Sequence, residues 1–411
     1  MNAALAPLRH AAYRRLLTGR TITTLGNAVA PIALAFAVLD LTGSVSMLGL
    51  IVGARSLANV AFLLLGGVLA DRLPRPVVLV GSNVLSGLTQ AVVAVLVLTH
   101  AAHVPTLIVL SALNGALSAL SLPATAALTP QTVPSEILQQ ANAVMRIGSN
   151  TALILGAAAG GALVAVVGPG WGLAIDAATF LLAGAVFVGL RVPRVANETG
   201  NGIVTDLREG WGEFTARTWV WVVVVAFTVI NATIGAMQVL GPAVADKTIG
   251  RSGWGLVLAA ETAGFVLGGL IALRTRYRRP LLAAMLWMAL EPLFLVGLGV
   301  APNLLVLIPL GVLVGIGVEQ FSVAWETTMQ QHIPPERLAR VYSYDMLGSY
   351  LAIPIGEVVA GPVAGSVGMT ATLLGAAALS LTAALAAAAT PSVRRLRRQD
   401  PSPAVAEPLP L

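Results

Sequence analysis

Long apolar runs separated by short polar segments are the feature that most constrains this chain. About 20 consecutive apolar residues are enough to cross a bilayer as a helix, and runs of this length recur along almost the whole sequence. Only 10% of the 411 residues are charged, whereas about a quarter are charged in soluble globular proteins. The chain is therefore expected to be an all-α polytopic membrane protein. It has no cysteine, which excludes a disulfide scaffold and cysteine-ligated zinc or iron–sulfur sites.

Hydropathy and helix-breaking residues together predict twelve transmembrane helices in two six-helix bundles. They are expected near 17–39, 46–69, 76–99, 104–128, 143–167, 171–190, 218–242, 253–273, 280–300, 303–326, 342–366 and 368–390. The polar segment between the bundles interleaves Trp211 and Phe214 with charges, a pattern typical of an amphipathic surface helix. The expected domains are 1–190 (N-terminal bundle), 191–217 (linker), 218–390 (C-terminal bundle) and 391–411 (disordered tail).

Most of the 24 basic residues fall on one side of this membrane map. They lie in the N-terminal segment, the linker, the tail and the loops after the second, fourth, eighth and tenth spans, whereas Lys247 and Arg251 fall on the other side. Because basic loops stay in the cytoplasm, the linker and both termini are expected there, in a bacterial cytoplasmic membrane. The net charge of +6 is thus a topology signal, with membrane lipids as a secondary partner and no nucleic acid.

Two internal alignments indicate a duplication. At an offset of 200 residues Gly156 and Gly161 match Gly356 and Gly361, and at an offset of 206 Gly49 matches Gly255. Six helices repeated in one orientation predict a pseudo-twofold axis along the membrane normal and a central cavity that opens alternately to each side. Chance similarity between Ala- and Gly-rich helices is the alternative.

The segment after the second span carries a motif. Residues 67–76 read Gly-Val-Leu-Ala-Asp-Arg-Leu-Pro-Arg-Pro, which resembles the loop signature of the major facilitator superfamily. An acid at a helix end can bind a helix N-terminus or an arginine when two halves close, and release it when they part. The inner-gate candidates are therefore Asp71, Arg72 and Arg75, together with Asp345, for which helix capping is the alternative.

Further stretches resemble the branch of that superfamily that contains macrolide-efflux proteins and enterobactin exporters. They are Arg20–Asn27, the loop Val133–Glu136, Asp176–Phe180, Trp325-Glu326 and Arg340–Asp345. The resemblance implies a monomeric secondary active transporter that exports a small amphipathic compound, a drug or secondary metabolite, by alternating access as a proton antiporter. It implies no enzyme activity, and no cofactor, metal or ATP site is expected. Uptake or flipping of another solute, such as a lysophospholipid, and a non-transporting receptor or scaffold are the alternatives.

Few ionisable residues fall deep in the spans, where each one costs at least about 2.5–3.5 kcal/mol. Glu261 and Glu319 are the candidates for proton coupling, because a carboxyl in a low dielectric can load and release a proton near neutral pH. Arg55 and Glu357 lie at similar depth on the second and eleventh spans, so an ion pair between them is predicted as part of an outer gate. Glu291, beside Pro292, is expected to satisfy backbone groups freed by the proline.

Other polar and aromatic residues have two possible roles each. Asp40, Asp176 and Asp246 fall near predicted outer helix ends and are expected to be solvated. The candidates for a substrate cavity are Asn27, Asn59, Asn114, Asn150, Met237, Gln238, Gln320 and Phe321, with helix packing as the alternative for each. Trp171, Trp219, Trp221 and Trp254 are expected to be membrane-interface anchors.

Overall fold

The computed structural model describes residues 3–72, 75–134, 137–190 and 211–398, and these fold into helices and short connections. The first half contains the 3-10 helix η1 (Ala3–Arg9), α1 (Ala11–Thr42), α2 (Val45–Arg72), α3 (Arg75–Leu98), α4 (Val104–Thr132), α5 (Leu138–Val167) and α6 (Pro169–Val188). The second contains α8 (Thr218–Lys247), α9 (Gly250–Arg274), α10 (Pro280–Met288), α11 (Pro292–Val300), α12 (Leu304–His332), α13 (Pro335–Tyr350), α14 (Ala352–Val367), α15 (Met369–Ala389) and α16 (Pro391–Arg395). Within the described residues 12 stretches are long and apolar enough to cross a membrane, so the expected fold class is confirmed.

Two predicted spans are interrupted. The span expected at 280–300 is divided into α10 and α11, and the one expected at 342–366 into α13 and α14. In both cases the first helix stops four residues before a proline, at Met288 before Pro292 and at Tyr350 before Pro354. A proline ring clashes with the carbonyl four residues earlier and offers no N–H to it, which accounts for both interruptions.

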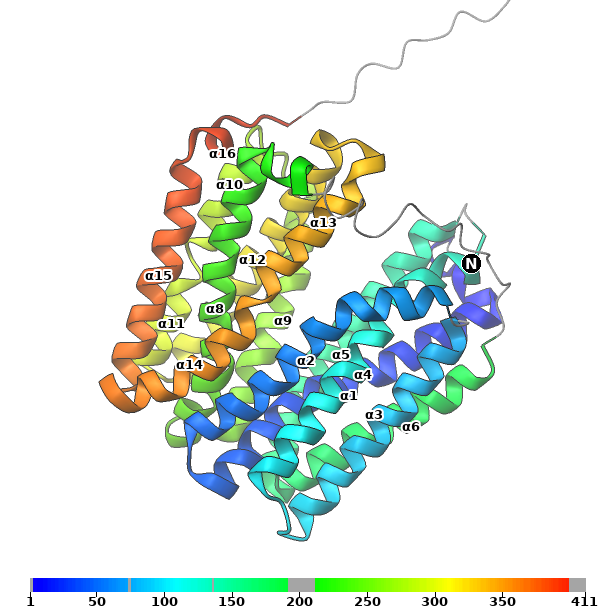
Figure 1. Ribbon diagram of the computed structural model, residues 1–411, viewed down its shortest axis with the longest axis vertical. Helices are drawn as coiled ribbons and strands as arrows, with labels where there is room; N and C mark the ends of the chain where they lie inside the picture. The colour runs from blue at the N-terminus through cyan, green and yellow to red at the C-terminus, as the bar shows by residue number, and fades with distance from the viewer. Residues whose placement is uncertain (1–2, 73–74, 135–136, 191–210, 399–411) are drawn as a thin grey trace, which may run out of the picture.

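The two halves lie side by side and are not parallel. In Figure 1 they meet toward the lower end and diverge toward the upper end, where the N-terminus and α16 lie. We call these the far end and the termini end of the molecule. The turns between α1 and α2 and between α8 and α9 lie at the far end.

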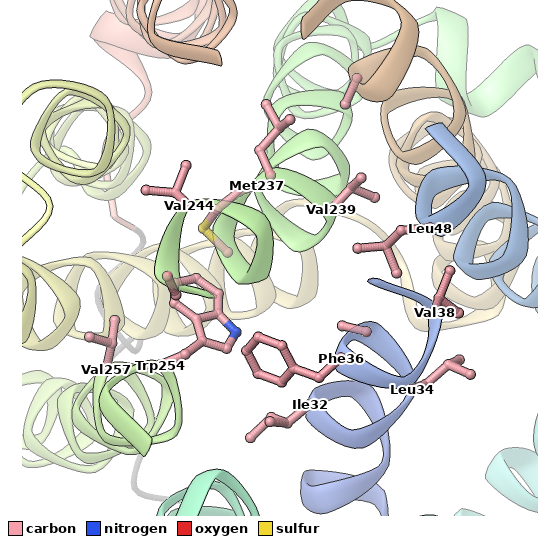
Figure 2. Packing of buried hydrophobic residues seen from close by; sticks show 14 of the residues in the cluster. Ile32, Leu34, Phe36, Val38, Leu48, Met237, Val239, Val244, Trp254 and Val257 are labelled. Carbon is pink, nitrogen blue, oxygen red and sulfur yellow. The ribbon is translucent and has the colours of Figure 1, made fainter. Parts of the chain in front are cut away.

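The buried apolar side chains are arranged in the same way as the halves. At the far end one cluster joins the halves, and in Figure 2 the ring of Phe36 lies beside Trp254, with Leu48 and Val239 close by. We call this the shared cluster. Elsewhere each half has separate clusters, one around Trp219 and Trp325 in the second half and others around Leu16, Phe187 and Tyr13 in the first. The described core therefore seals the halves together at the far end.

Helix contacts across the halves repeat the internal duplication. A Cβ atom at Gly49 of α2 would clash with the carbonyl oxygen of Glu357 on α14, and one at Gly255 of α9 would lie 2.5 Å from the carbonyl oxygen of Ala157 on α5. These two contacts are related by the offsets of 206 and 200 found in the sequence. Glycine at both positions lets the paired backbones touch, so the halves are pseudo-symmetric in packing as well as in sequence.

The last part of the linker packs on the second half. Residues 191–210 lie outside the described residues, and 211–215 form a short helix. Phe214 is buried against Tyr344 of α13, with the two ring centroids 5.9 Å apart. Glu213 forms ion pairs with Arg217, at 2.5 Å, and with Arg337 of α13. These contacts attach the end of the linker to the segment that precedes α14.

Candidate functional site

A cavity of about 490 Å³ lies between the two halves. Helices α1, α2 and α4 line it from the first half, and α8, α9 and the junction of α13 with α14 line it from the second. Its apolar wall includes Ile32, Met237 and Trp254, and its polar lining includes Arg55, Ser56, Asn59, Gln238, Glu261 and Tyr350. Trp254 was expected at the membrane interface, but only 2% of its surface is exposed because it packs in the shared cluster.

Arg55 and Glu261 are the charged residues in this lining, one from each half. Arg55 interacts electrostatically with two carboxylates, Asp176 of α6 and Glu357 of α14. No basic group of the described chain forms an ion pair with Glu261, whose surroundings act on it mainly through burial. The cavity therefore presents one balanced cation and one carboxyl group that lacks a counter-ion.

The predicted ion pair between Arg55 and Glu357 is not formed in this structure. Instead Ser56, the next residue of α2, donates a hydrogen bond of 2.9 Å to Oε1 of Glu357, whose surface is 0% exposed. Both residues line the cavity, but consecutive residues of a helix point about 100° apart, so the hydroxyl of Ser56 reaches Glu357 while the guanidinium of Arg55 is not within ion-pairing distance of it. The depth comparison from the sequence placed Arg55 and Glu357 at similar height, but it did not specify which face of α2 meets α14.

A different ion pair joins the halves at the far end. Arg251, at the start of α9, donates from Nη1 to Oδ2 of Asp40 on α1 at 2.9 Å and from Nε to Oδ1 of Asp246 at 3.1 Å. Its guanidinium also lies 4.9 Å from the centroid of the Phe36 ring, next to the shared cluster. The sequence analysis treated both aspartates as solvated helix ends. Arg251 could have indicated this pairing, because it is one of only two basic residues that the predicted topology places on the same side as these aspartates.

Asp176 is also placed differently from the expectation. Only 1% of its surface is exposed, and neither carboxylate oxygen has a hydrogen-bond partner among the described residues. It lies about two turns inside α6, which begins at Pro169, and its side chain points at α1. It is therefore a buried acid and not a solvated helix end.

The remaining intramembrane carboxylates have partners. Glu319 of α12 forms an ion pair of 3.0 Å with Arg146 of α5, a second link between the halves, and the side chain of Arg146 is 66% exposed. Glu319 does not line the cavity described above. Glu291 accepts a hydrogen bond of 2.5 Å from Ser380 of α15, so its observed partner is a side chain of another helix and not the backbone freed by the proline.

The candidate cavity residues divide into two groups. Asn59, Met237 and Gln238 line the cavity, whereas Asn27, Asn114, Asn150, Gln320 and Phe321 do not. Asn114 donates to the carbonyl of Ser86 at 3.4 Å, and Gln320 donates to the carbonyl of Gly268 at 2.7 Å, both on neighbouring helices. The ring of Phe321 stacks on Phe227 with centroids 3.9 Å apart. Helix packing occupies the side chains of Asn114, Gln320 and Phe321.

Only part of the predicted inner gate is described. The side chains of Asp71, Arg72 and Arg75 lie outside the described residues. Asp345 accepts a hydrogen bond of 2.9 Å from Nε1 of Trp325 and one of 3.2 Å from Ser349, both within its own half. In this conformation Asp345 therefore connects α12 to α13, and its role as a gate stays a prediction.

Two equivalent six-helix halves around a polar-lined cavity form the architecture of a secondary transporter. The sequence matches the Major Facilitator Superfamily over residues 16–356, and the chain belongs to that family. It is thus a multi-pass membrane protein of a transporter family.

Named relatives cover nearly the whole chain at low identity. The "Multidrug efflux pump Tap" of Mycolicibacterium fortuitum is 27% identical over 395 residues, which cover 91% of this chain and 94% of that protein. The "Macrolide efflux protein A" of Streptococcus pyogenes is 21% identical over 399 residues, covering 94% of this chain and 97% of that protein. The crystal structure of the nucleoside transporter NupG superposes with a TM-score of 0.74 at 14% identity, covering 97% of this chain and 100% of that one, which supports the fold alone.

Proposed function

We propose that this protein exports a small amphipathic compound, a drug or a secondary metabolite, across the bacterial cytoplasmic membrane as a proton antiporter. The observation that carries this proposal is the cavity between the halves, where Glu261 has no counter-ion and stands among apolar and aromatic side chains. Apolar walls with a few polar groups suit an amphipathic ligand. Efflux by two relatives that match almost the full chain supports export as the direction.

In the proposed alternating-access cycle, this structure is the form in which the far end is closed and the cavity is reached from the termini end. With both termini in the cytoplasm, as the distribution of basic residues favours, the far end faces outward and is closed by the shared cluster and by the Asp40–Arg251 pair. The cavity then receives its substrate from the cytoplasmic side. Opening the far end requires α2 to part from α14 and α9 from α5, which breaks the Ser56–Glu357 hydrogen bond as well as that ion pair.

Glu261 is the proposed coupling group. An ionised carboxylate without a counter-ion is strongly disfavoured in a cavity of low dielectric, so it is stabilised either by a proton or by a polar or cationic part of the substrate. Competition between the two at one carboxyl group links export to proton entry. Glu319 is the second candidate, and its pair with Arg146 joins α5 to α12.

The test uses everted membrane vesicles from a pump-deficient bacterial host, with erythromycin and ethidium as probes. Wild-type vesicles should accumulate a probe when a proton gradient is applied, and Glu261→Gln should abolish that accumulation. Glu291→Gln is the matched control, because Glu291 is a buried acid that binds Ser380 outside the cavity. Since the charges of Glu291 and Glu261 interact, the control requires only that proton-driven accumulation is retained. Accumulation that needs no proton gradient, or that survives in Glu261→Gln, would contradict the coupling mechanism. Sensitisation of cells that overexpress the protein would instead indicate uptake.

A further inference from the structure

Two charged residues among the described ones of the first half lie neither toward the termini end, as Arg20 and Arg146 do, nor in the last turn at the far end, as Asp40 does. They are Arg55 of α2 and Asp176 of α6. Arg55 lines the cavity, whereas Asp176 does not. Because charged residues are rare in such a setting and need a partner or a purpose, an acid that lacks a direct partner requires an explanation.

None of the described residues donates a hydrogen bond to the carboxyl group of Asp176. Thr179, the nearest hydroxyl on its own helix, donates to the main-chain carbonyl of Asp176 at 2.7 Å and not to the side chain. On the facing helix α1, a Cβ at Gly26 would lie 2.6 Å from Oδ1 of Asp176, so the carboxyl group packs directly on a bare stretch of helix backbone. The N–H groups of that stretch are used within α1 itself.

The charged residues of the helices that pack against α6 lie near the ends of those helices, away from the level of Asp176. On α1 the ionisable residues lie toward the termini end, up to Arg20, and at the far end, at Asp40. On α3 and α5 they are Arg75 and Arg146, both near the termini end. The charge that acts on Asp176 is Arg55, and it is not within ion-pairing distance.

Arg55 is shared between the halves. It interacts with Asp176 in its own half and with Glu357, which α14 brings in from the other half. One oxygen of Glu357 accepts from Ser56, and the other has no hydrogen-bond partner in the part of the chain that the structure describes. Two buried carboxyl groups thus face a single cation, and at least one of them is most stable when it is neutral.

We propose that Asp176 is a proton-binding site of the first half, occupied while the far end is closed. A neutral acid is far less costly to bury without a partner than a carboxylate is. When the far end opens, α14 leaves α2, and Asp176 becomes the remaining counter-charge of Arg55. The O–H bond of the acid then breaks, the proton passes to water in the cavity beside Arg55, and the carboxylate pairs with the guanidinium.

The reverse step gives the site a place in transport. Closing the far end returns Glu357 to Arg55, and Asp176 takes up a proton from the cavity water before that water is cut off from the outside. Proton uptake therefore accompanies closure of the far end and release accompanies its opening. Both exchanges are with water on the outer side, so the site links closure to proton binding and does not itself carry a proton across the membrane. This role in transport rests on the proposed function, whereas the occupancy of Asp176 does not.

Infrared spectroscopy of the full-length protein in lipid nanodiscs tests the occupancy without any substrate. The infrared spectrum of the wild type minus that of Asp176→Asn, both at neutral pH, should contain the carbonyl band of a protonated carboxylic acid. Its intensity should correspond to one group per chain. Glu213→Gln is the matched control, since Glu213 forms ion pairs with Arg217 and Arg337 in the linker, outside the spans; it should leave the band unchanged. Equal bands in wild type and Asp176→Asn would overturn the proposal.

A second variant covers the case in which Asp176→Asn does not fold. At the pH where half of the Glu357→Gln band has been lost, the double variant Arg55→Gln/Glu357→Gln should have a larger band, because Asp176 has lost the cation that favours its carboxylate and Glu357 no longer contributes. An unchanged or smaller band would contradict the proposal. If the band is present but erythromycin accumulation does not depend on the proton gradient, the proton site at Asp176 is supported and the proposed proton coupling is contradicted. If accumulation is proton-driven and the band is absent, the site is excluded.

Discussion

At the scale of single residues, Arg251 makes the contacts that close the far end. It forms ion pairs with Asp40 on the other half and with Asp246 in its own half, and it lies over the ring of Phe36. The side chains of Arg251 and Asp40 are 22% and 44% exposed, so the pair is partly solvated. We therefore expect it to bias the conformational equilibrium rather than to lock it.

Arg251→Gln should accordingly open the far end more often. A partly exposed pair contributes roughly 0.2–1 kcal/mol, which corresponds to an increase of up to about fivefold in the open population. Because the chain has no cysteine, Ser46→Cys at the start of α2 supplies a single thiol whose labelling rate reports this opening. Arg274→Gln, the same change at the other end of α9, should leave the rate unchanged. A slower rate in Arg251→Gln would show that the pair does not hold the far end closed.

The candidate residues show what sequence can resolve at this scale. Depth along a helix follows from counting residues, so Arg55 and Glu357 were placed at matching heights. The face of the helix depends on neighbours that one sequence does not specify, and Ser56 therefore took the predicted contact. Asp176 was misplaced for a related reason, since its side chain packs on Gly26 of α1, a contact that the sequence does not specify.

At the scale of helices, close contacts between backbones hold the far end together. The contact of Gly255 on α9 with Ala157 on α5 has no room for a side chain. Gly255→Val should therefore disfavour this conformation by about 1–3 kcal/mol, the usual range for overpacking. Labelling of Ser46→Cys should then rise about 5- to 150-fold.

The matched control for that substitution is Gly375→Val on α15. No atom lies within 4 Å of a Cβ at this position, so the variant should label like the wild type. Retained helical circular dichroism would exclude unfolding as the cause of faster labelling in Gly255→Val. If Gly255→Val labels at the wild-type rate, the α5–α9 contact does not control the far end.

The linker helix offers a pH test outside the membrane. Hydrogen bonding to Arg217, followed by the charges of Arg217 and Arg337, lowers the pKa of Glu213 below its ordinary value of 4.5. A carboxylate with a lowered pKa stabilises the packed state above its ordinary pKa and loses that contribution as pH falls through the lowered one. The packing of 211–215 on α13 should therefore weaken below about pH 4.5.

Fluorescence of Trp211, which stacks on Phe214, should report this loss on acidification. Glu213→Gln should show the weakened state already at neutral pH and no further change between pH 6 and about 4. An acid transition that persists in Glu213→Gln would assign the effect to another group.

Breaks within helices were less predictable from sequence than the helices themselves. Prolines also occur inside α1, α8, α12 and α14, which remain continuous. By contrast, α10 ends before Pro292 and α13 ends before Pro354. Hydropathy does not distinguish prolines that break a helix from prolines that do not, because all of these segments are apolar. Tertiary contacts decide, such as the packing of Glu291 on Ser380 at the first break.

At the scale of the whole molecule, the fold was the most predictable feature. Hydropathy gave the spans, and the repeated glycines gave the symmetry, because burial in lipid and close helix packing both leave their mark on composition. The conformation was not predictable, since one sequence must encode both open forms of a transporter. The cavity and the closure of the far end therefore had to come from the structure.

That closure predicts which membrane face gives access to the cavity. Gln238 is exposed in the cavity lining, so a membrane-impermeant maleimide should label Gln238→Cys in inside-out vesicles and much more slowly in right-side-out ones. His103→Cys, in the exposed turn before α4 at the far end, should show the opposite preference. Labelling of both positions from the same side would contradict the proposed orientation or the closed far end.

The shared cluster around Phe36 and Trp254 also has a thermal consequence. Opening the far end brings apolar side chains of this cluster into contact with water, which raises the heat capacity of the open form. The equilibrium between the two forms should therefore curve with temperature, and the apolar contact that favours closure weakens on cooling. A molecule held shut in this way would spend more of its cycle open to the outside in the cold, and Ser46→Cys would become more reactive there relative to an unstructured thiol.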